Sequence, residues 1–357
     1  MKSIERRKKT MKRDFLLVVL LASLVLLSFA GCGGNDKAEA PGQSSQKVIT
    51  IKTGGTVPDS HPISIGMYAF GDALKDLSGG QLKGEHFSNL VLGGQRDIIE
   101  MVQNGAIQGA ECSIAVVAGF SDEVTITSLP FLFPSREVAY EFMDGKYGQQ
   151  LSDQVASDSG IRFLGYMENG IRMLSNSKRS IETPADMKGL KFRVMESPIY
   201  IKMFQAFGAA ATPMSFAEVY TGLQQGTVDG QDNPWALTVA QKFYEVNHYV
   251  TDLGHTFDFA PLMINEDFYQ GLTDEQKGWV DEAAKAAVKA NREACIAADD
   301  ANIAILKENT VYTELTDEQR QAFKIAAQPV YDWYISEYND KVRLTEWQAE
   351  IDKIANK

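Results

Sequence analysis

Cysteine and histidine are scarce in this chain, which limits the kinds of site it can build. After Cys32 only Cys112 and Cys295 remain, and nothing in their spacing demands a disulfide. A bond between these two stays possible outside the cytoplasm, but their apolar or helical surroundings favour two buried thiols. No metal-ligand spacing joins the four histidines, which are His61, His86, His248 and His255. We therefore expect no metal and no other cofactor.

Catalytic signatures are missing as well. The sequence contains no phosphate-binding loop and no G-x-S-x-G nucleophile motif. No nucleophile and base can be paired from the sequence, so an exported hydrolase is the least favoured function.

Positive charge is scarce outside the N-terminus. Residues 1–31 carry seven basic and two acidic residues, a net +5, so the remainder of this −12 chain has a formal charge of −17. So acidic a body argues against nucleic acid as a partner and against a basic membrane-binding surface. An anionic ligand would need a local group of arginines to overcome the surrounding field.

The N-terminal residues have the pattern of an export signal. "MKRDFLLVVLLASLVLLSFAGC" has a basic start, an apolar run from Phe15 to Phe29 and small residues before Cys32. Either Met1 or Met11 fits as the start. Residues 29–32 resemble the lipobox of bacterial lipoproteins, with Phe29 in place of the usual leucine. An ordinary cleaved signal or a single membrane helix is the alternative, although the run is short for a spanning helix.

This pattern predicts a signal peptide over 1–31, a lipidated Cys32 and a flexible polar tether over 32–47. The globular part would lie outside the cytoplasm, in the periplasm or at the outer face of the cytoplasmic membrane. Its only membrane attachment would be the lipid.

One eleven-residue phrase occurs twice. "MVQNGAIQGAE" (101–111) and "GLQQGTVDGQD" (222–232) share a glutamine and two glycines, and Glu111 aligns with Asp232. Each phrase ends an apolar run with helical spacing, meets a glycine that can end a helix, and continues into a short strand. Because such junctions are common, chance is an alternative. Otherwise the repeat indicates two similar α/β lobes.

The body has room for two such lobes. "VITIKTGG" (48–55) predicts a strand, 63–80 predicts an amphipathic helix, and strand-like pieces recur at 160–166, 190–196 and 208–214. This alternation points to largely parallel sheets with a ligand at the carboxyl ends of the strands. "LTDEQ" occurs at 272–276 and 315–319 as a capping box. The first copy opens a helix from Asp274 to about Lys307, long enough to span both lobes; a coiled coil is less favoured because the run is rich in alanine.

Longer motifs resemble one family. "SIETPADMKGLKFRVMESP", "FGAAATPMSFAEVYTGLQQGTVDGQDNP" and "AQKFYEVNHYVTDLGH" are similar to the solute receptors of tripartite ATP-independent periplasmic (TRAP) transporters, of the dicarboxylate-receptor (DctP) type. "LGGQRDIIEMVQNGAIQGA" and "SLPFLF" match too, and the resemblance runs from about 48 to about 290. It implies a two-lobed periplasmic-binding-protein-like α/β fold with a ligand cleft between the lobes. Lobe I would comprise 48–169 and about 259–300, and lobe II 170–258 and about 301–357.

The resemblance implies that one arginine binds a carboxylate of the ligand, and that arginine is Arg193. Phe192 and Val194 alternate with Lys191 and Arg193, so two basic side chains share one face of a strand. A guanidinium can bind a carboxylate through two parallel hydrogen bonds, whereas lysine cannot. Without the resemblance, a surface ion pair would explain Arg193 as well.

Further ligand-binding residues follow from the same resemblance. Arg172 matches a second arginine near the carboxylate, and its alternative is a charge at a strand edge. Asn233 matches a residue that hydrogen-bonds the ligand where a helix opens, and Asp232 beside it replaces the more usual glutamate. Phe216 matches an aromatic residue that packs on the ligand, unless it is plain core.

In lobe I, His61 and Ser113 match loops that face the cleft. Receptors for sialic acid carry a glutamate near the position of Ser113 and an arginine three residues later, where this chain has Val116. The departure argues against sialic acid.

The predicted function is therefore an extracytoplasmic receptor, not an enzyme. It would capture a small organic acid, either a C4-dicarboxylate or a sugar acid such as a uronate or aldonate, and deliver it to TRAP permease subunits. The alternative is a sensing receptor that hands its closed form to a signalling partner. We expect a monomer.

Overall fold

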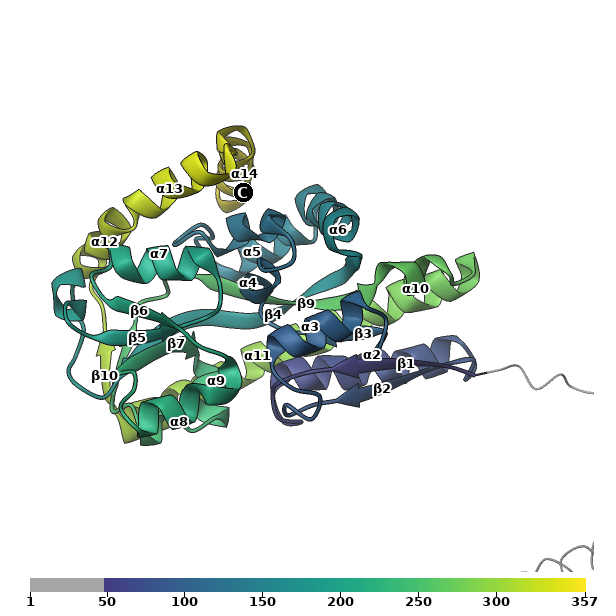
Figure 1. The fold of residues 1–357 in the computed structure, drawn as a ribbon, viewed down its shortest axis with the longest axis horizontal. Coiled ribbons are helices and arrows are strands. Elements are labelled where there is room, and N and C mark those ends of the chain that lie inside the picture. The colour runs from purple at the N-terminus through teal and green to yellow at the C-terminus, as the bar shows by residue number, and fades with distance from the viewer. Residues whose placement is uncertain (1–47) are drawn as a thin grey trace, which may run out of the picture. The chain divides into compact units, whose positions relative to one another are not determined.

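The computed structural model describes residues 48–357. The signal peptide predicted over 1–31, Cys32 and the tether to residue 47 lie outside the described residues. Within 48–357, helices surround a sheet of ten strands (Figure 1). In that range no helix combines the length and the apolar composition that crossing a bilayer requires.

The strands run in the order β2-β1-β3-β9-β4-β7-β5-β6, and β8 and β10 pair beside β4. Pairing is parallel among β1, β2 and β3, among β5, β6 and β7, and between β8 and β10, but β4 and β9 run antiparallel to their neighbours. The predicted parallel pairing is thus correct only away from these two strands. The strands are β1 (Ile49–Gly54), β2 (Leu82–Phe87), β3 (Gly109–Glu111), β4 (Ile161–Asn176), β5 (Lys191–Val194), β6 (Ala210–Pro213), β7 (Gly230–Pro234), β8 (Tyr249–Asp252), β9 (Phe257–Asn265) and β10 (Val311–Glu314).

Strand β4 belongs to both halves of the sheet. Its residues 161–171 pair with β9, and residues 172–176 pair with β7, with 174–176 also against β8. A register shift falls between Glu168 and Gly170, and Gly170 has φ +131°, which side-chain-bearing residues rarely adopt. Figure 1 shows β1 and β2 at one end of the molecule, β5, β6 and β7 at the other, and β4 and β9 between them.

Helices cover both faces of the sheet. The predicted helix at 63–80 is α2, which ends at Leu77, and most of the others are short. The α-helices are α2 (Pro62–Leu77), α3 (Gln95–Gln103), α4 (Ile114–Val117), α5 (Arg136–Met143), α6 (Lys146–Ser159), α7 (Pro198–Ala206), α8 (Val219–Gln224), α9 (Trp235–Ala240), α10 (Glu266–Gln270), α11 (Asp274–Asn309), α12 (Asp317–Ala326), α13 (Gln328–Tyr338) and α14 (Lys341–Ala355). The 3₁₀ helices are η1 (Asp122–Ser128), η2 (Pro184–Met187), η3 (Phe216–Glu218) and η4 (Phe243–Glu245).

The repeated phrase forms the same structure twice. In each copy a helix, α3 or α8, ends before a glycine in the left-handed region, Gly105 with φ +76° or Gly226 with φ +70°, and a strand follows. Even one hydrogen bond is repeated: the Ile107 N–H donates to the Met101 carbonyl, and the Val228 N–H to the Gly222 carbonyl, at 3.3 and 3.5 Å. The predicted helix–glycine–strand unit is therefore confirmed in both copies.

Helix α11 connects the two ends of the molecule. It extends for 36 residues from the predicted capping box at Thr273, about 54 Å at 1.5 Å per residue. It packs along α2 and then along α9. Its alanines allow a close approach, since a Cβ placed on Gly66 of α2 would lie 2.9 Å from the Ala287 carbonyl oxygen. Close packing, rather than a coiled-coil seam, accounts for the alanine-rich composition.

Asn291 attaches β4 to the middle of α11. Its side chain accepts a hydrogen bond from the Glu168 N–H at 2.6 Å and donates one to the Glu168 carbonyl at 3.1 Å. Cys295 lies one turn further along α11 and, like Cys112, is a buried free thiol, as predicted. Asn291 thus satisfies both backbone polar groups of Glu168, a residue at the irregular part of β4.

The C-terminal helices pass back over the molecule, as the yellow segment of Figure 1 shows. Helix α13 packs on α7, and α14 packs on α5, where Trp347 lies 4.8 Å from Phe142 between ring centroids. Arg343 also forms an ion pair with Glu123. The proposed lobe boundaries stay a prediction. The C-terminal helices α13 and α14, both within the predicted lobe II, contact one element of each predicted lobe, α7 of lobe II and α5 of lobe I.

Replacing Asn291 with leucine should destabilise the fold. The buried Glu168 N–H would lose its partner and the carbonyl would keep only the weak donor Cys295 Sγ at 3.7 Å. We expect a loss of about 2–4 kcal/mol in the free energy of unfolding, measured by urea denaturation. Asn309→Leu, at the exposed end of the same helix, should change it by less than about 0.5 kcal/mol. Equal effects of the two substitutions would contradict the role of Asn291.

Candidate functional site

Arg193 is a buried cation with an incomplete set of partners. It lies near the carboxyl end of β5 and is 3% exposed, whereas Lys191, at the start of the strand, is exposed. Of the two basic side chains predicted to share one face of this strand, only that of Arg193 is therefore buried. Its Nε donates to the Met214 carbonyl at 2.9 Å, and the guanidinium forms no ion pair with a described acidic side chain. Burial lowers the pKa of Arg193 to about 10, and the nearby charge of Asp232 partly opposes this, so the group is still cationic at pH 7.

Arg172, by contrast, has acceptors for four of its five guanidinium N–H groups. Its Nε lies 2.6 Å from Asp232 Oδ2, its Nη1 lies 3.0 Å from Asp258 Oδ2, and its Nη2 donates to the Asp232 carbonyl and to Asn233 Oδ1. One N–H of Nη1 is left without a described acceptor. The Tyr200 ring packs over the guanidinium, with 5.5 Å between the guanidinium carbon and the ring centroid. Arg172 is thus mainly the centre of a buried ion-pair network that joins β4, β7 and β9.

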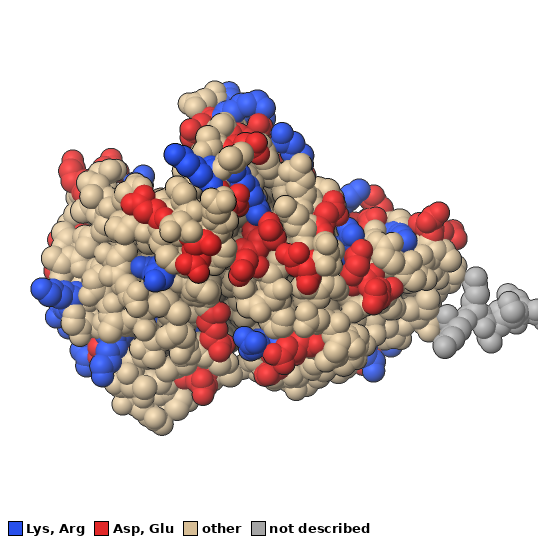
Figure 2. All heavy atoms as spheres, turned by 45° about the horizontal axis from the view of Figure 1, so that its top comes forward, with Lys and Arg blue, Asp and Glu red and all other residues tan. Residues whose placement is uncertain are grey.

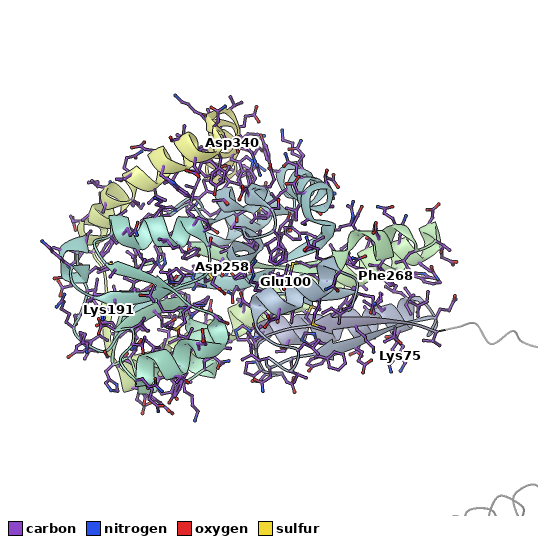
Figure 3. All side chains as sticks on the ribbon, in the orientation of Figure 1. Lys75, Glu100, Lys191, Asp258, Phe268 and Asp340 are labelled. Atoms are coloured by element: carbon purple, nitrogen blue, oxygen red, sulfur yellow. The ribbon has the colours of Figure 1, made fainter. Side chains whose placement is uncertain are left out.

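The two carboxylates of this network differ. Burial raises the pKa of Asp232, but the charge of Arg172 and a hydrogen bond with His255 outweigh it and hold the pKa well below its usual range. For Asp258 burial prevails over Arg172, and the pKa is raised. Asp258 also accepts hydrogen bonds from Ser113 at 2.9 Å and from Asn169 at 2.7 Å. In Figure 3, Asp258 lies near the middle of the molecule, far from Lys191 at the outer end.

Of the remaining lobe II residues predicted for the site, Asn233 belongs to this network, and Phe216 follows the segment that contacts Arg193. Asn233, two residues before α9, accepts from Arg172 at 3.2 Å and donates to Gln231 at 2.5 Å. Phe216 opens η3, two residues after the Met214 carbonyl that Arg193 contacts, and packs against Phe243 with 6.2 Å between ring centroids. Because Phe216 is buried against Phe243, its position fits a core residue as well as a residue that contacts the ligand.

The two lobe I residues lie where helices begin. His61 caps α2, accepting from the Ile63 N–H at 3.3 Å, while its Nε2 is buried without a hydrogen-bond partner. Burial lowers the pKa of His61 to about 4. Ser113 caps α4 and donates to Asp258. Asp258 therefore brings Ser113 and Arg172 together, although 59 residues separate them in sequence.

Sequence reasoning missed Asp258 and Glu111. A signal existed for each: Asp258 is a charged residue within a strand whose nine residues are all buried, and Glu111 aligns with Asp232 in the repeated phrase. Glu111 is 1% exposed, and its carboxyl group accepts one hydrogen bond, from the Thr56 N–H at 3.2 Å.

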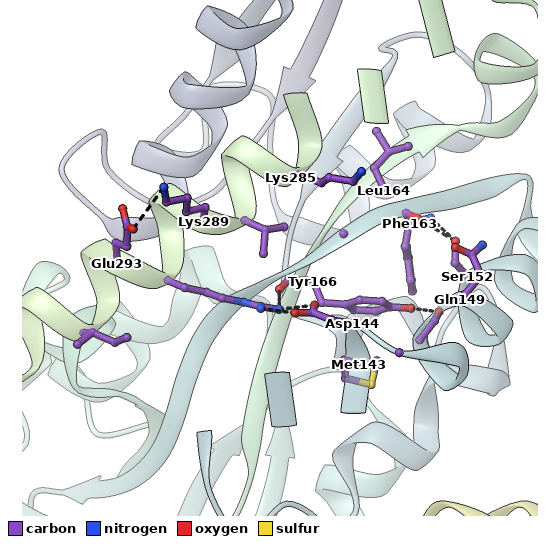
Figure 4. Close-up of a pocket in the computed structure, with 16 residues that line it drawn as sticks. Met143, Asp144, Gln149, Ser152, Phe163, Leu164, Tyr166, Lys285, Lys289 and Glu293 are labelled. Atoms are coloured by element: carbon purple, nitrogen blue, oxygen red, sulfur yellow. Dashed lines mark hydrogen bonds and ion pairs between the residues drawn. The ribbon is translucent and has the colours of Figure 1, made fainter. Parts of the chain in front are cut away.

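One cavity of about 640 Å³ lies elsewhere, between α6, β4 and α11 (Figure 4). None of the predicted site residues lines it. Its basic residues already have acidic partners, Arg292 with Asp144, Lys289 with Glu293 and Lys285 with Glu282. The cavity therefore offers an organic anion no unpaired charge. On the surface face in Figure 2, acidic side chains are spread over the middle and basic ones lie in small groups.

Comparison with known proteins agrees with this fold. The chain is 34% identical over 286 residues to the 2,3-diketo-L-gulonate-binding periplasmic protein YiaO of Escherichia coli, covering 79% of this chain and 86% of that protein. A TRAP periplasmic solute-binding protein of Polaromonas, solved with D-erythronate, superposes with a TM-score of 0.80 at 33% identity, covering 84% of this chain and 98% of the other. One from Sulfurospirillum deleyianum, solved with succinate, has a TM-score of 0.78 at 28% identity, covering 86% and 99%.

These neighbours are two-lobed α/β receptors, so the predicted fold class is confirmed. The model of the bacterial extracellular solute-binding proteins, family 7 (DctP), matches residues 53–337. This chain therefore belongs to that family, the solute-binding receptors of TRAP transporters, which bind and do not catalyse.

Proposed function

We propose that this protein captures a small organic acid outside the cytoplasm, through Arg193, and delivers it to the membrane permease of a TRAP transporter. The observation that carries the proposal is the buried guanidinium of Arg193, which has one backbone acceptor and no acidic partner among the described residues. A buried charge without a counter-ion is costly, and a ligand carboxylate would supply both the opposite charge and two parallel hydrogen bonds.

The other predicted residues would complete the binding site. Asn233 and the free N–H of Arg172 would donate to the same end of the ligand, and Phe216 would pack on its carbon skeleton. His61 and Ser113 would contact it from lobe I. Every one of these side chains is buried, as the closed form of such a site requires.

Closure would follow from binding. A ligand bound to Arg193 in lobe II gains contacts with lobe I only when the lobes come together, so it favours the closed form. The permease could then distinguish loaded from empty receptor by shape. The receptor would act as a monomer.

Replacing Arg193 with lysine should weaken binding without unfolding the protein. The charge remains but the two parallel hydrogen bonds are lost, a change of about 1.5–3 kcal/mol, which is roughly tenfold to over a hundredfold in Kd. Calorimetric titration with the tightest acid of an organic-acid panel measures it, and X-ray scattering should show a smaller radius of gyration for the loaded parent protein. Arg96→Lys, at an exposed arginine, is the matched control. An unchanged Kd in Arg193→Lys would move the carboxylate site elsewhere.

Replacing Arg172 with alanine should instead destabilise the protein. Asp232 and Asp258 would remain buried without their cation, which should lower the free energy of unfolding by about 3–5 kcal/mol. The loss in the free energy of unfolding, relative to the parent protein, should be smaller at pH 5 than at pH 8. The two carboxylates left without a cation bind protons more readily in acid, which removes their charge. Urea denaturation at both pH values tests this against Arg96→Ala. A loss no larger than that of the control would show that the network does not stabilise the fold.

The anchor at Cys32 is also part of the proposal. The motif at 29–32 motivates it, and the mature protein should begin at an acylated Cys32. Cys32→Ser should release the protein from membranes or block its maturation. If the variant fractionates and migrates like the parent, the chain is not a lipoprotein.

A further inference from the structure

The two copies of the repeated phrase place an acid at the same position in each half of the sheet, but with different partners. Asp232 in β7 is paired with Arg172. Glu111, at the end of β3, forms no ion pair with a described basic side chain and accepts one backbone N–H. Burial raises the pKa of Glu111 to about 8, with the Thr56 N–H opposing the shift, so the group is mostly a neutral carboxylic acid at pH 7. A neutral carboxylic acid can both donate and accept a hydrogen bond.

A neutral imidazole, that of His86, also lies beside Glu111. A Cβ placed on Gly55 would overlap Glu111 Oε1 and lie 2.8 Å from Cε1 and 3.1 Å from Nε2 of His86, so the two side chains meet at this glycine. The Nε2 atoms of His86 and His61 are buried without hydrogen-bond partners. Burial lowers the pKa of His86 to about 4, with the charge of Asp59 opposing the shift, so both histidines are neutral at pH 7. We call Glu111, His61 and His86, together with Ser113, the lobe I wall.

Two series of contacts connect this wall to the arginines. In the first, the Thr56 N–H bonds to Glu111, and Thr56 Oγ1 lies 3.5 Å from Gln95 Nε2. Gly94, the neighbour of Gln95, approaches lobe II, because a Cβ there would lie 3.1 Å from Ser215 Oγ. Ser215 follows Met214, whose carbonyl accepts from Arg193.

The second series is shorter. Ser113 donates to Asp258, and Asp258 accepts from Arg172. Glu111 and Ser113 of the lobe I wall are therefore each connected to one of the two arginines by a short series of contacts.

The charges in this region can balance one carboxylate group of a ligand. Among residues 48–357, Arg172 and Arg193 are the only buried arginines, and no lysine is buried. Arg172 is already opposed by two aspartates, so Arg193 alone can balance a further negative charge. A second carboxylate would meet Glu111, Asp258 and two neutral histidines.

We infer that the ligand has a single carboxylate, bound by Arg193, and hydroxyl groups that bind the lobe I wall through Glu111 and the free Nε2 atoms of His61 and His86. The ligand is then a polyhydroxy monocarboxylic acid, such as an aldonate or uronate, rather than a C4-dicarboxylate. This inference rests on the proposed function and narrows it. A hydroxyl group suits the wall because it both donates and accepts, whereas a carboxylate there would lose its hydration without gaining a cation.

Matched acids test the inference on the parent protein. D-Erythronate and succinate have the same number of carbons but one and two carboxylates, and D-gluconate and D-glucarate form a second such pair. We expect the monocarboxylate to bind at least about tenfold more tightly in any pair that binds, by calorimetric titration at pH 7. Tighter or equal binding of the dicarboxylate overturns the inference and leaves the proposed function standing. Failure of all four acids to bind counts against both.

A substitution tests the role of Glu111. Glu111→Met keeps the size of the side chain and removes its polar atoms, so the preferred monocarboxylate should bind about tenfold more weakly. Glu100→Met, at an exposed acid of α3, is the matched control and should leave binding unchanged. Melting temperatures establish that both variants fold. A folded Glu111→Met with unchanged Kd overturns the role of Glu111, and an unfolded one leaves the matched acids to decide.

Discussion

The ion pairs of the Arg172 guanidinium hold the elements of the candidate site together. The guanidinium joins β4 to Asp232 of β7 and to Asp258 of β9, and Asp258 extends the connection to Ser113 at the start of α4. Such a network is stable only when each charge has its partners, because an unpaired charge in a dry interior is expensive. With Arg172 neutralised in this way, the field it would otherwise exert on a ligand is largely cancelled. The neighbouring Arg193 is then the buried arginine among residues 48–357 that has no acidic partner, which is why we propose it as the carboxylate-binding group.

Much of the local structure could be predicted from the sequence because local chemistry determines it. The two copies of the repeated phrase predicted two helix–glycine–strand units, because a left-handed backbone position after a helix strongly favours glycine. The capping box at Thr273 marked the start of α11, and the absence of proline let the helix continue to Asn309. The alternation of residues around Arg193 predicted that it lies on a strand. It did not predict that Arg193 is buried while Lys191 is exposed, because burial depends on what covers each end of the strand.

The partners of Arg172 could not be predicted in the same way. Asp232 and Asp258 are 60 and 86 residues away, and only the order of strands in the folded sheet brings them to one guanidinium. The same holds for Glu111, whose raised pKa follows from its burial without an ion-pair partner among residues 48–357. His61 shows the opposite case: the cap of α2 is a local feature, but a histidine is not among the usual capping residues. The resemblance to the family identified the candidate positions. The folded structure then shows which of these charged side chains have ion-pair partners and which do not.

The attachment of Glu168 to Asn291 has a mechanical consequence. On one side the Glu168 peptide is fixed to α11, and on the other the Arg172 side chain is fixed to β7 and β9. Only Asn169, Gly170 and Ile171 lie between these two attachments. Two of these three residues, Gly170 and Ile171, also pair with β9, and Gly170 stands at a register shift with φ +131°. A path of three residues within one strand therefore joins α11 to the ion pairs of Arg172, so the position of the ion-pair network is coupled to that of the helix through a short covalent connection.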